Sequence, residues 1–308
     1  MKRIAHHIRA KGGIDFALIN SGLDWKSVLR DVALVCQIRE DVRVIVLQPH
    51  GSQAQRLTGS GSLMFKQLVA RLIAQVDAVF LLSSEEVNQV QRFAPRARVH
   101  HVKNPYDPAW LQSSRIPIRE GQFNVLFVGR VVREKGVLDL VSAAADVDGR
   151  GALDVTLVGA GPEEDGVRRL VRDLGLERSV RLAGLADAAA LREAYASADV
   201  LALPSYTEGF PTVVAEAMGF GLPVVCTRIR GLADYLTDGV HTIFVEPGDP
   251  AGLRQALLNL RDDIGLRRQM SENNLRLVRE FRPSTVAGEY RGIINELIAR
   301  KRSAAPML

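Results

Sequence analysis

The chain has 308 residues, about twice the usual size of a single domain, so two domains are expected. Apolar residues make up 47% of it, charged residues 24% and aromatic residues 6%, which is typical of a globular protein with an aliphatic core and excludes a largely disordered chain. No apolar run approaches the ~20 residues that cross a bilayer, and no secretory signal follows the charged start. The chain has two cysteines, Cys36 and Cys226, whose spacing is not that of a metal site, and this low cysteine content favours a location in the reducing cytoplasm.

The net charge is +5, and the basic excess gathers at the two ends of the chain. Residues 1–11 contain lysines and arginines but no acid, and residues 300–302 are all basic. Two interpretations remain open: solvated tails, or contact with an anionic membrane or an anionic substrate. Nucleic acid is not an expected partner, because aromatic residues are scarce and no nucleic-acid-binding motif accompanies the charge.

Short runs rich in Val, Ile and Leu alternate with longer amphipathic segments, which predicts parallel strands joined by crossover helices. The first group of strands is expected at residues 15–20, 42–47, 78–82 and 99–102. The second group is expected at residues 123–128, 154–158, 180–182, 200–203, 224–227 and 242–245. Helices of the second group are expected at residues 137–145, 163–174, 188–196 and 212–218, with closing helices at 251–280 and 284–301.

Prolines and weak periodicity between the two groups indicate a linker. We therefore expect a shortened N-terminal Rossmann-like domain over residues 1–112, a linker over 113–122 and a second Rossmann-like domain over 123–280. A C-terminal helix and tail follow at 281–308.

The strand expected at 123–128 is followed by a glycine and two basic residues. Gly129 allows a sharp turn at the carboxyl end of the strand, and Arg130 and Lys135 precede the next helix. The start of a helix offers unpaired N–H groups to an anion. On its own the motif fits two solvated basic residues better than a phosphate-binding loop, and it gains weight only from the motifs that follow.

A second motif follows the strand at 200–203. Pro211 suits the first turn of a helix, so Glu208 precedes that helix and Glu216 lies within it among apolar neighbours. A carboxylate in such surroundings needs hydrogen bonds, either from the adjacent hydroxyls of a ligand such as ribose or from a backbone amide or basic side chain. The N–H groups of Gly209 and Phe210 face the helix entrance and are able to hold a phosphate.

Three rival motifs fail. Gly159 and Gly161 resemble the start of a dinucleotide fingerprint, but Glu164 stands where its third glycine should be. No P-loop motif is present, which argues against a P-loop nucleotidase. Asp146 and Asp148 have the spacing of the metal-binding aspartate pair of a different transferase fold. They follow an expected helix rather than a strand, so a chance occurrence explains the pair better than a metal site does.

Five motifs in a fixed order resemble the donor half of a retaining glycosyltransferase of the GT-B family 4. They are Gly129-Arg130-x4-Lys135-Gly136, Val158-Gly159-Ala160-Gly161-Pro162, Leu182-Ala183-Gly184, Ala198-Asp199-Val200 and Glu208-x7-Glu216. The match covers roughly residues 123–280. The resemblance implies an α/β chain of two Rossmann-like domains that face a cleft, the first of them truncated.

The resemblance also implies roles for individual residues. Glu208 would lie beside the donor sugar as a catalytic residue, and Glu216 would bind the ribose. The donor diphosphate would be bound by Gly129, Arg130 and Lys135, the donor sugar by Gly209, Phe210 and Pro211, and the base by Leu185 and Ala186.

The first domain resembles the family less closely. Its strand ending in His50 and Gly51 is similar to the family's His-Gly strand, which implies a catalytic position for His50 opposite the donor sugar. The family's opening strand and glycine-rich loop have no counterpart before residue 15. The alternative is therefore a sugar-nucleotide-binding module that needs a partner or an upstream segment to catalyse; a sugar-nucleotide epimerase on the same architecture fits the Glu208-x7-Glu216 motif less well.

The implied activity is transfer of a hexosyl unit from a nucleoside diphosphate sugar to an acceptor hydroxyl with retention of configuration. The acceptor would be a sugar, a lipid-linked molecule or a polysaccharide, in glycan or cell-envelope biosynthesis. No metal and no cofactor are expected, because Arg130, Lys135 and helix dipoles would neutralise the diphosphate. The expected location is cytoplasmic, with peripheral contact to the anionic inner face of the membrane.

Overall fold

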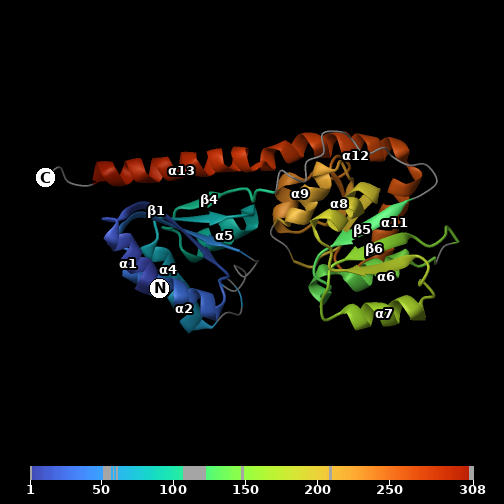
Figure 1. The fold of residues 1–308 in the computed structure, drawn as a ribbon, viewed down its shortest axis with the longest axis horizontal. Helices are drawn as coiled ribbons and strands as arrows, with labels where there is room; N and C mark the ends of the chain where they lie inside the picture. Colours follow the sequence, from blue (N-terminus) through green and yellow to red (C-terminus); the bar gives the residue numbers. More distant parts are fainter. Residues whose placement is uncertain are drawn as a thin grey trace. The chain divides into compact units, whose positions relative to one another are not determined.

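A computed structural model of the chain describes residues 2–50, 57, 59, 62–106, 123–146, 149–207 and 210–304. The chain divides into two compact units, one made of Met1–Asn104 with Ser284–Leu308 and the other of Pro105–Pro283 (Figure 1). The expected linker at 113–122 lies outside the described residues. The C-terminal helix therefore belongs with the first unit, although it follows the second along the chain.

The first unit contains a four-stranded parallel sheet in the order β1-β2-β3-β4. Its strands are β1 (Ile14–Ser21), β2 (Val42–Pro49), β3 (Ala78–Leu81) and β4 (Val99–His101). Its helices are α1 (Lys2–Ala10), α2 (Trp25–Ile38), α4 (Leu63–Gln75), α5 (Ser84–Phe93) and most of α13 (Pro283–Ala304). The four predicted strands are confirmed to within one or two residues, since apolar runs buried in a parallel sheet are the clearest signal in such a sequence.

Helix α13 is held to the first sheet by apolar and polar contacts. Leu297 is buried in a cluster with residues of β2 and β3 and with Val102, which follows β4. Gln48 Nε2 donates to the Tyr290 hydroxyl at 2.8 Å, and Lys301 pairs with Asp77 at 2.7 Å. Burial alone would raise the pKa of Asp77, but Lys301, the amide of Ile45 and Arg39 together lower it. Asp77 therefore ties the last turn of α13 to the sheet.

The described basic residues at the two ends of the chain are largely exposed to solvent, but they belong to helices rather than to unstructured tails. Residues 2–10 form α1, whose Ala5 and Ile8 are buried in the first core because they lie one turn apart on the same face. Arg9 pairs with Asp41 at 2.8 Å. At the other end, Arg300 pairs with Glu296 one turn earlier.

The second unit contains a six-stranded parallel sheet in the order β10-β9-β8-β5-β6-β7. Its strands are β5 (Asn124–Val128), β6 (Asp154–Val158), β7 (Val180–Gly184), β8 (Val200–Leu203), β9 (Val224–Thr227) and β10 (Thr242–Val245). All six predicted strands are confirmed. The strand order reverses at β5, which has β6 on one side and β8 on the other, and this reversal is the usual ligand-binding position of a doubly wound sheet.

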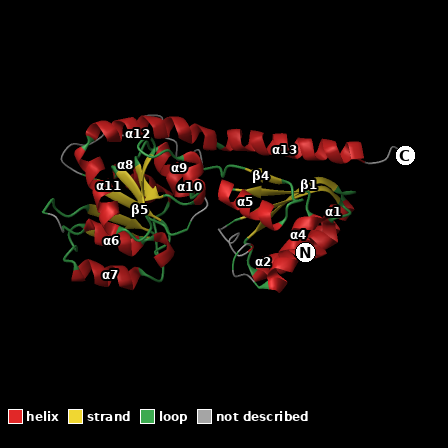
Figure 2. Ribbon diagram, turned by 180° about the vertical axis from the view of Figure 1, so that it is seen from behind, coloured by secondary structure: helices red, strands yellow, loops and turns green. Residues whose placement is uncertain are grey.

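Helices cover both faces of this sheet (Figure 2). They are α6 (Val137–Ala144), α7 (Glu164–Asp173), α8 (Ala188–Ser197), α9 (Thr212–Gly219), α10 (Arg230–Tyr235), α11 (Pro250–Asp262) and α12 (Ile264–Leu277), with short 3-10 turns η2 (Arg133–Lys135) and η3 (Val278–Phe281). The helical prediction over 251–280 is confirmed, and the segment is divided at Asp263, whose side chain accepts a hydrogen bond from Leu266 N and starts α12. Within the described ranges, no helix is long and apolar enough to cross a membrane.

The loops after β5 and β6 approach so closely that only glycine fits at residue 159. Gly159 has a φ of +133°, and a Cβ there would lie 1.8 Å from the carbonyl oxygen of Gly129. The first glycine of the apparent dinucleotide fingerprint is therefore explained by the contact between two loops.

Gly159→Ala should lower the free energy of unfolding of the second unit by about 3 kcal/mol, since it combines a backbone clash with a left-handed conformation. Gly175→Ala is the matched control, because Gly175 also has a positive φ, +67°, but has nothing within 4 Å of a Cβ. It should cost about 1 kcal/mol. Urea unfolding of the two variants measures the difference, and equal losses would contradict the close approach.

Candidate functional site

Four loops of the second unit form a continuous rim along the carboxyl edge of its sheet. The rim consists of residues 129–136 after β5, 159–163 after β6, 184–187 after β7 and 204–207 after β8. Backbone hydrogen bonds join neighbouring loops: Gly159 N to Gly184 O at 2.8 Å, Val131 N to Ala160 O at 3.0 Å, and Tyr206 N to Glu134 O at 2.8 Å. The positions of the four loops relative to one another are thus fixed by the main chain.

The loop after β5 carries the two predicted basic residues. Arg130 is exposed directly after Gly129, and Lys135 is half-buried at the end of η2. Gly136 then adopts a left-handed φ of +65°, and a Cβ there would lie 2.0 Å from the carbonyl oxygen of Pro204. The loop therefore packs against the start of the β8 loop, so that both basic residues lie at the strand-order reversal.

The β8–α9 loop is anchored on both sides of Glu208 and Gly209, which themselves lie outside the described residues. Before them, the Tyr206 amide bonds to the β5 loop. After them, the Phe210 ring is buried and stacks on Phe281 with ring centroids 4.6 Å apart. Pro211 is the N-cap residue of α9, one position earlier than its expected place in the first turn. The side chain of Phe210 is thus part of the core, which leaves its main chain to face a ligand.

Glu216 lies half-buried in α9 and has a partner that the sequence did not predict. The Tyr195 hydroxyl donates to Glu216 Oε2 at 2.8 Å. Burial and the neighbouring Glu216 carboxylate raise the pKa of Tyr195, so its phenol stays protonated and acts as a donor. An ionised carboxylate has about four acceptor positions, so this bond is compatible with further bonds from a ligand.

The loop predicted to contact a base lies at the end of the rim after β7. Leu185 is 83% exposed, Ala186 is half-buried, and Asp187 begins α8 by accepting hydrogen bonds from Ala189 N and Ala190 N. An exposed leucine fixed between a strand and a capped helix offers an apolar surface on which a planar base is able to lie.

His50 lies in the first unit, at the carboxyl end of β2. Its amide donates to Ser21 O at 2.7 Å, and Asn20 Oδ1 accepts a hydrogen bond from its Nε2 at 3.0 Å. Burial lowers the pKa of His50, which favours the neutral ring at pH 7. With Nε2 donating to Asn20, Nδ1 is the ring nitrogen that is able to accept a proton.

Two other sequence motifs have structural roles. Asp199 is buried, and its Oδ2 accepts a hydrogen bond from Asn124 N at 2.9 Å, so it joins β5 to β8 at their amino ends. Asp146 accepts a hydrogen bond from the buried Arg254 at 3.5 Å, while Asp148 lies outside the described residues.

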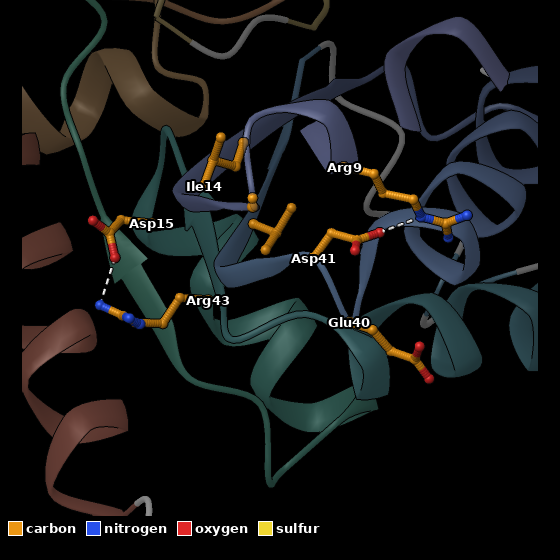
Figure 3. A pocket seen from close by; sticks show the side chains of 9 residues that line it. Arg9, Ile14, Asp15, Glu40, Asp41 and Arg43 are labelled. Carbon is orange, nitrogen blue, oxygen red and sulfur yellow. Dashed lines mark hydrogen bonds and ion pairs between the residues drawn. The ribbon is translucent and has the colours of Figure 1, made fainter. Parts of the chain in front are cut away.

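Figure 3 shows a pocket of the first unit that is a weaker candidate. It lies at the amino ends of β1 and β2, the edge opposite His50, and Arg9, Asp41, Arg43 and Asp15 are among its lining residues. Arg9 pairs with Asp41 at 2.8 Å and Arg43 with Asp15 at 2.5 Å. Glu40 also lines the pocket, so three acidic side chains stand against two basic ones and leave one excess negative charge, which does not suit an anionic ligand.

Known structures share the fold of the whole chain. Sucrose-phosphate synthase from Thermosynechococcus elongatus superimposes with a TM-score of 0.79 at 22% identity, covering 97% of this chain and 78% of that one. HepE from Anabaena, solved in complex with UDP, superimposes with a TM-score of 0.77 at 18% identity, covering 95% of this chain and 82% of that one. Both likenesses show the α/β fold of GT-B glycosyltransferases.

Curated relatives are similar over part of their length. The D-inositol 3-phosphate glycosyltransferase of Corynebacterium kroppenstedtii is 38% identical over 158 residues, which are 48% of this chain and 35% of that protein. The glycogen synthase of Mycobacterium tuberculosis is 30% identical over 247 residues, 77% of this chain and 59% of that protein. The chain thus spans between about a third and three fifths of the length of these two relatives. The family model for "glycosyl transferases group 1" matches residues 109–276, more than half of the chain, and the chain therefore belongs to that family.

Proposed function

We propose that this chain is a family 4 glycosyltransferase that transfers a hexosyl unit from a nucleoside diphosphate sugar to an acceptor hydroxyl with retention of configuration. One observation carries the proposal: Arg130 and Lys135 lie at the strand-order reversal, on a loop bonded to the segment that leads to Glu208. Membership of the family supports transfer of a glycosyl group. The complex of HepE with UDP supports a nucleoside diphosphate as the donor's carrier.

In this proposal the rim binds the donor. Arg130 and Lys135 pair with the diphosphate, since two positive charges match its phosphates without a metal ion or cofactor. Glu216 accepts hydrogen bonds from the ribose hydroxyls. Leu185 and Ala186 contact the base, and the segment from Glu208 to Pro211 contacts the sugar through its carboxylate and main-chain groups.

The proposed reaction takes place on one face of the sugar. The bond between the anomeric carbon and the diphosphate oxygen breaks, and a bond to the acceptor oxygen forms on the same face. The acceptor proton passes to the departing diphosphate, whose negative charge Arg130 and Lys135 stabilise. Glu208 supports the oxocarbenium-like charge, and His50 is the proposed catalytic residue of the first unit.

The proposed acceptor is a sugar, a lipid-linked molecule or a polysaccharide in glycan or cell-envelope biosynthesis. The LpsE protein of Rhizobium meliloti, a lipopolysaccharide core biosynthesis glycosyltransferase, supports this class; it is 32% identical over 167 residues, 54% of this chain and 48% of that protein.

The proposed location is cytoplasmic, with peripheral contact to the anionic membrane. Exposed basic residues near both ends of the chain, such as Arg3 and Arg302, support such contact, because basic residues are attracted to an anionic surface.

Lys135→Ala should weaken binding of UDP, GDP or ADP by about ten- to a hundredfold, since a hydrogen bond to a charged group contributes about 1.5–3 kcal/mol. Binding of the corresponding nucleoside should not change. Arg133→Ala, an exposed basic residue of the same turn, is the control and should have little effect. Titration calorimetry measures all three proteins, and equal losses for nucleotide and nucleoside would contradict the diphosphate assignment.

Glu208→Gln should lower the rate of sugar transfer at least tenfold while leaving nucleoside diphosphate affinity unchanged, because its proposed partner is the sugar. Transfer is measured with the full chain and radiolabelled nucleoside diphosphate hexoses. A wild-type chain that binds the nucleotide without any transfer would instead support a binding module that needs a partner.

The pKa of His50 should lie below its ordinary value of 6.5, since burial disfavours the charged ring. Its contribution to stability is then present at pH 7 and is lost as the pH falls below 6.5, because the unfolded chain takes up the proton more readily. An NMR titration of the His50 ring measures the pKa, with His50→Gln to assign the signal. A midpoint at or above 6.5 would overturn this expectation.

A further inference from the structure

Tyr195 is fully buried in α8, yet its hydroxyl contacts the carboxylate proposed to bind ribose. The ring stacks on Phe220 with centroids 5.3 Å apart, and the hydroxyl lies 2.8 Å from Glu216 Oε2. The carbonyl oxygen of Val213 lies 3.5 Å from the same hydroxyl. A hydroxyl buried to this degree is costly without a hydrogen bond, and here the shorter contact is to Glu216.

The direction of this bond is fixed by the chemistry of its two groups. Tyr195 is a donor, because burial and the nearby carboxylate raise the pKa of its phenol. A bond from a neutral hydroxyl to an ionised carboxylate is charge-assisted and about twice as strong as a neutral one. The bond therefore restrains the side-chain torsions of Glu216.

Helix α8 connects this bond to the other end of the proposed nucleoside site. The helix begins at the Asp187 cap, directly after Leu185 and Ala186, and Tyr195 lies in its last turn. The rise from Asp187 to Tyr195 is about 12 Å at 1.5 Å per residue. One short rigid element thus relates the loop proposed to contact the base to the carboxylate proposed to contact the ribose.

We infer that Tyr195 is a positioning residue that orients the Glu216 carboxylate and thereby sets the preference for ribose over 2′-deoxyribose. The inference rests on the proposed function, in which Glu216 accepts hydrogen bonds from the ribose. Both ribose hydroxyls reach one carboxylate only when its plane is held toward them. A site that binds a hydroxyl in this way discriminates against the analogue that lacks it.

The test compares Tyr195→Phe with the wild-type full chain, since phenylalanine keeps the ring that stacks on Phe220. The probes are the best-binding member of UDP, GDP and ADP, its 2′-deoxy counterpart and inorganic pyrophosphate. The wild type should prefer the ribonucleotide at least tenfold, and Tyr195→Phe should reduce that preference to threefold or less. Pyrophosphate affinity should stay the same in both proteins.

Tyr290→Phe is the matched control, because it removes another tyrosine hydroxyl bond, that to Gln48 in the first unit. It should leave the preference for ribose unchanged. A preference that survives in Tyr195→Phe while Glu216→Gln abolishes it would overturn the inference and leave the proposed function standing. A wild type that binds both nucleotides equally would overturn the ribose assignment itself.

A second measurement covers the case in which Tyr195→Phe does not fold. In wild-type protein labelled with ¹³Cζ-tyrosine, the Tyr195 resonance should shift when the ribonucleotide is added and shift less with the 2′-deoxy analogue. Pyrophosphate should leave it in place. A Tyr195 signal that responds equally to both nucleotides would contradict the inference.

Discussion

The contact between main chains at the carboxyl edge of the second sheet is the constraint on which the proposed site depends. Backbone hydrogen bonds join the loops after β5, β6, β7 and β8, and glycines at 136 and 159 allow them to meet. The loops after β5, β7 and β8 contribute the proposed diphosphate, base and sugar contacts, and the loop after β6 packs against the β5 loop. Because main-chain contacts hold these loops, their side chains are able to face a ligand without also having to hold the fold together.

The same constraint separates two kinds of basic residue. Near the chain ends, Arg9 pairs with Asp41 and Lys301 with Asp77, which joins α1 and α13 to the rest of the first unit. Arg130 and Lys135 lie on the loop after β5, at the strand-order reversal of the second sheet. The small net positive charge of the chain therefore says little about binding, whereas the position of these two residues is specific.

The sequence predicts the strands and the location of the donor loops well, because buried parallel strands are apolar runs and their carboxyl ends meet at one edge. Contacts between distant elements are not predictable in this way. The packing of α13 on the first sheet, the Tyr195–Glu216 bond and the Asn20–His50 bond each join residues at least 21 positions apart. Helix α1 is not predicted from the sequence, because its many basic residues conceal the short apolar pair Ala5 and Ile8. The break at Asp263 is a local capping signal that the helical periodicity on either side conceals.

A nucleoside diphosphate should bind on the rim of the second unit. Hydrogen exchange followed by mass spectrometry, with and without a saturating nucleoside diphosphate, measures this binding. Exchange should slow in residues 129–136, 184–187 and 210–219, and should not change at the amino ends of β1 and β2 around Arg9 and Asp41. Protection confined to the first unit, or absent from residues 129–136, would contradict binding on the rim.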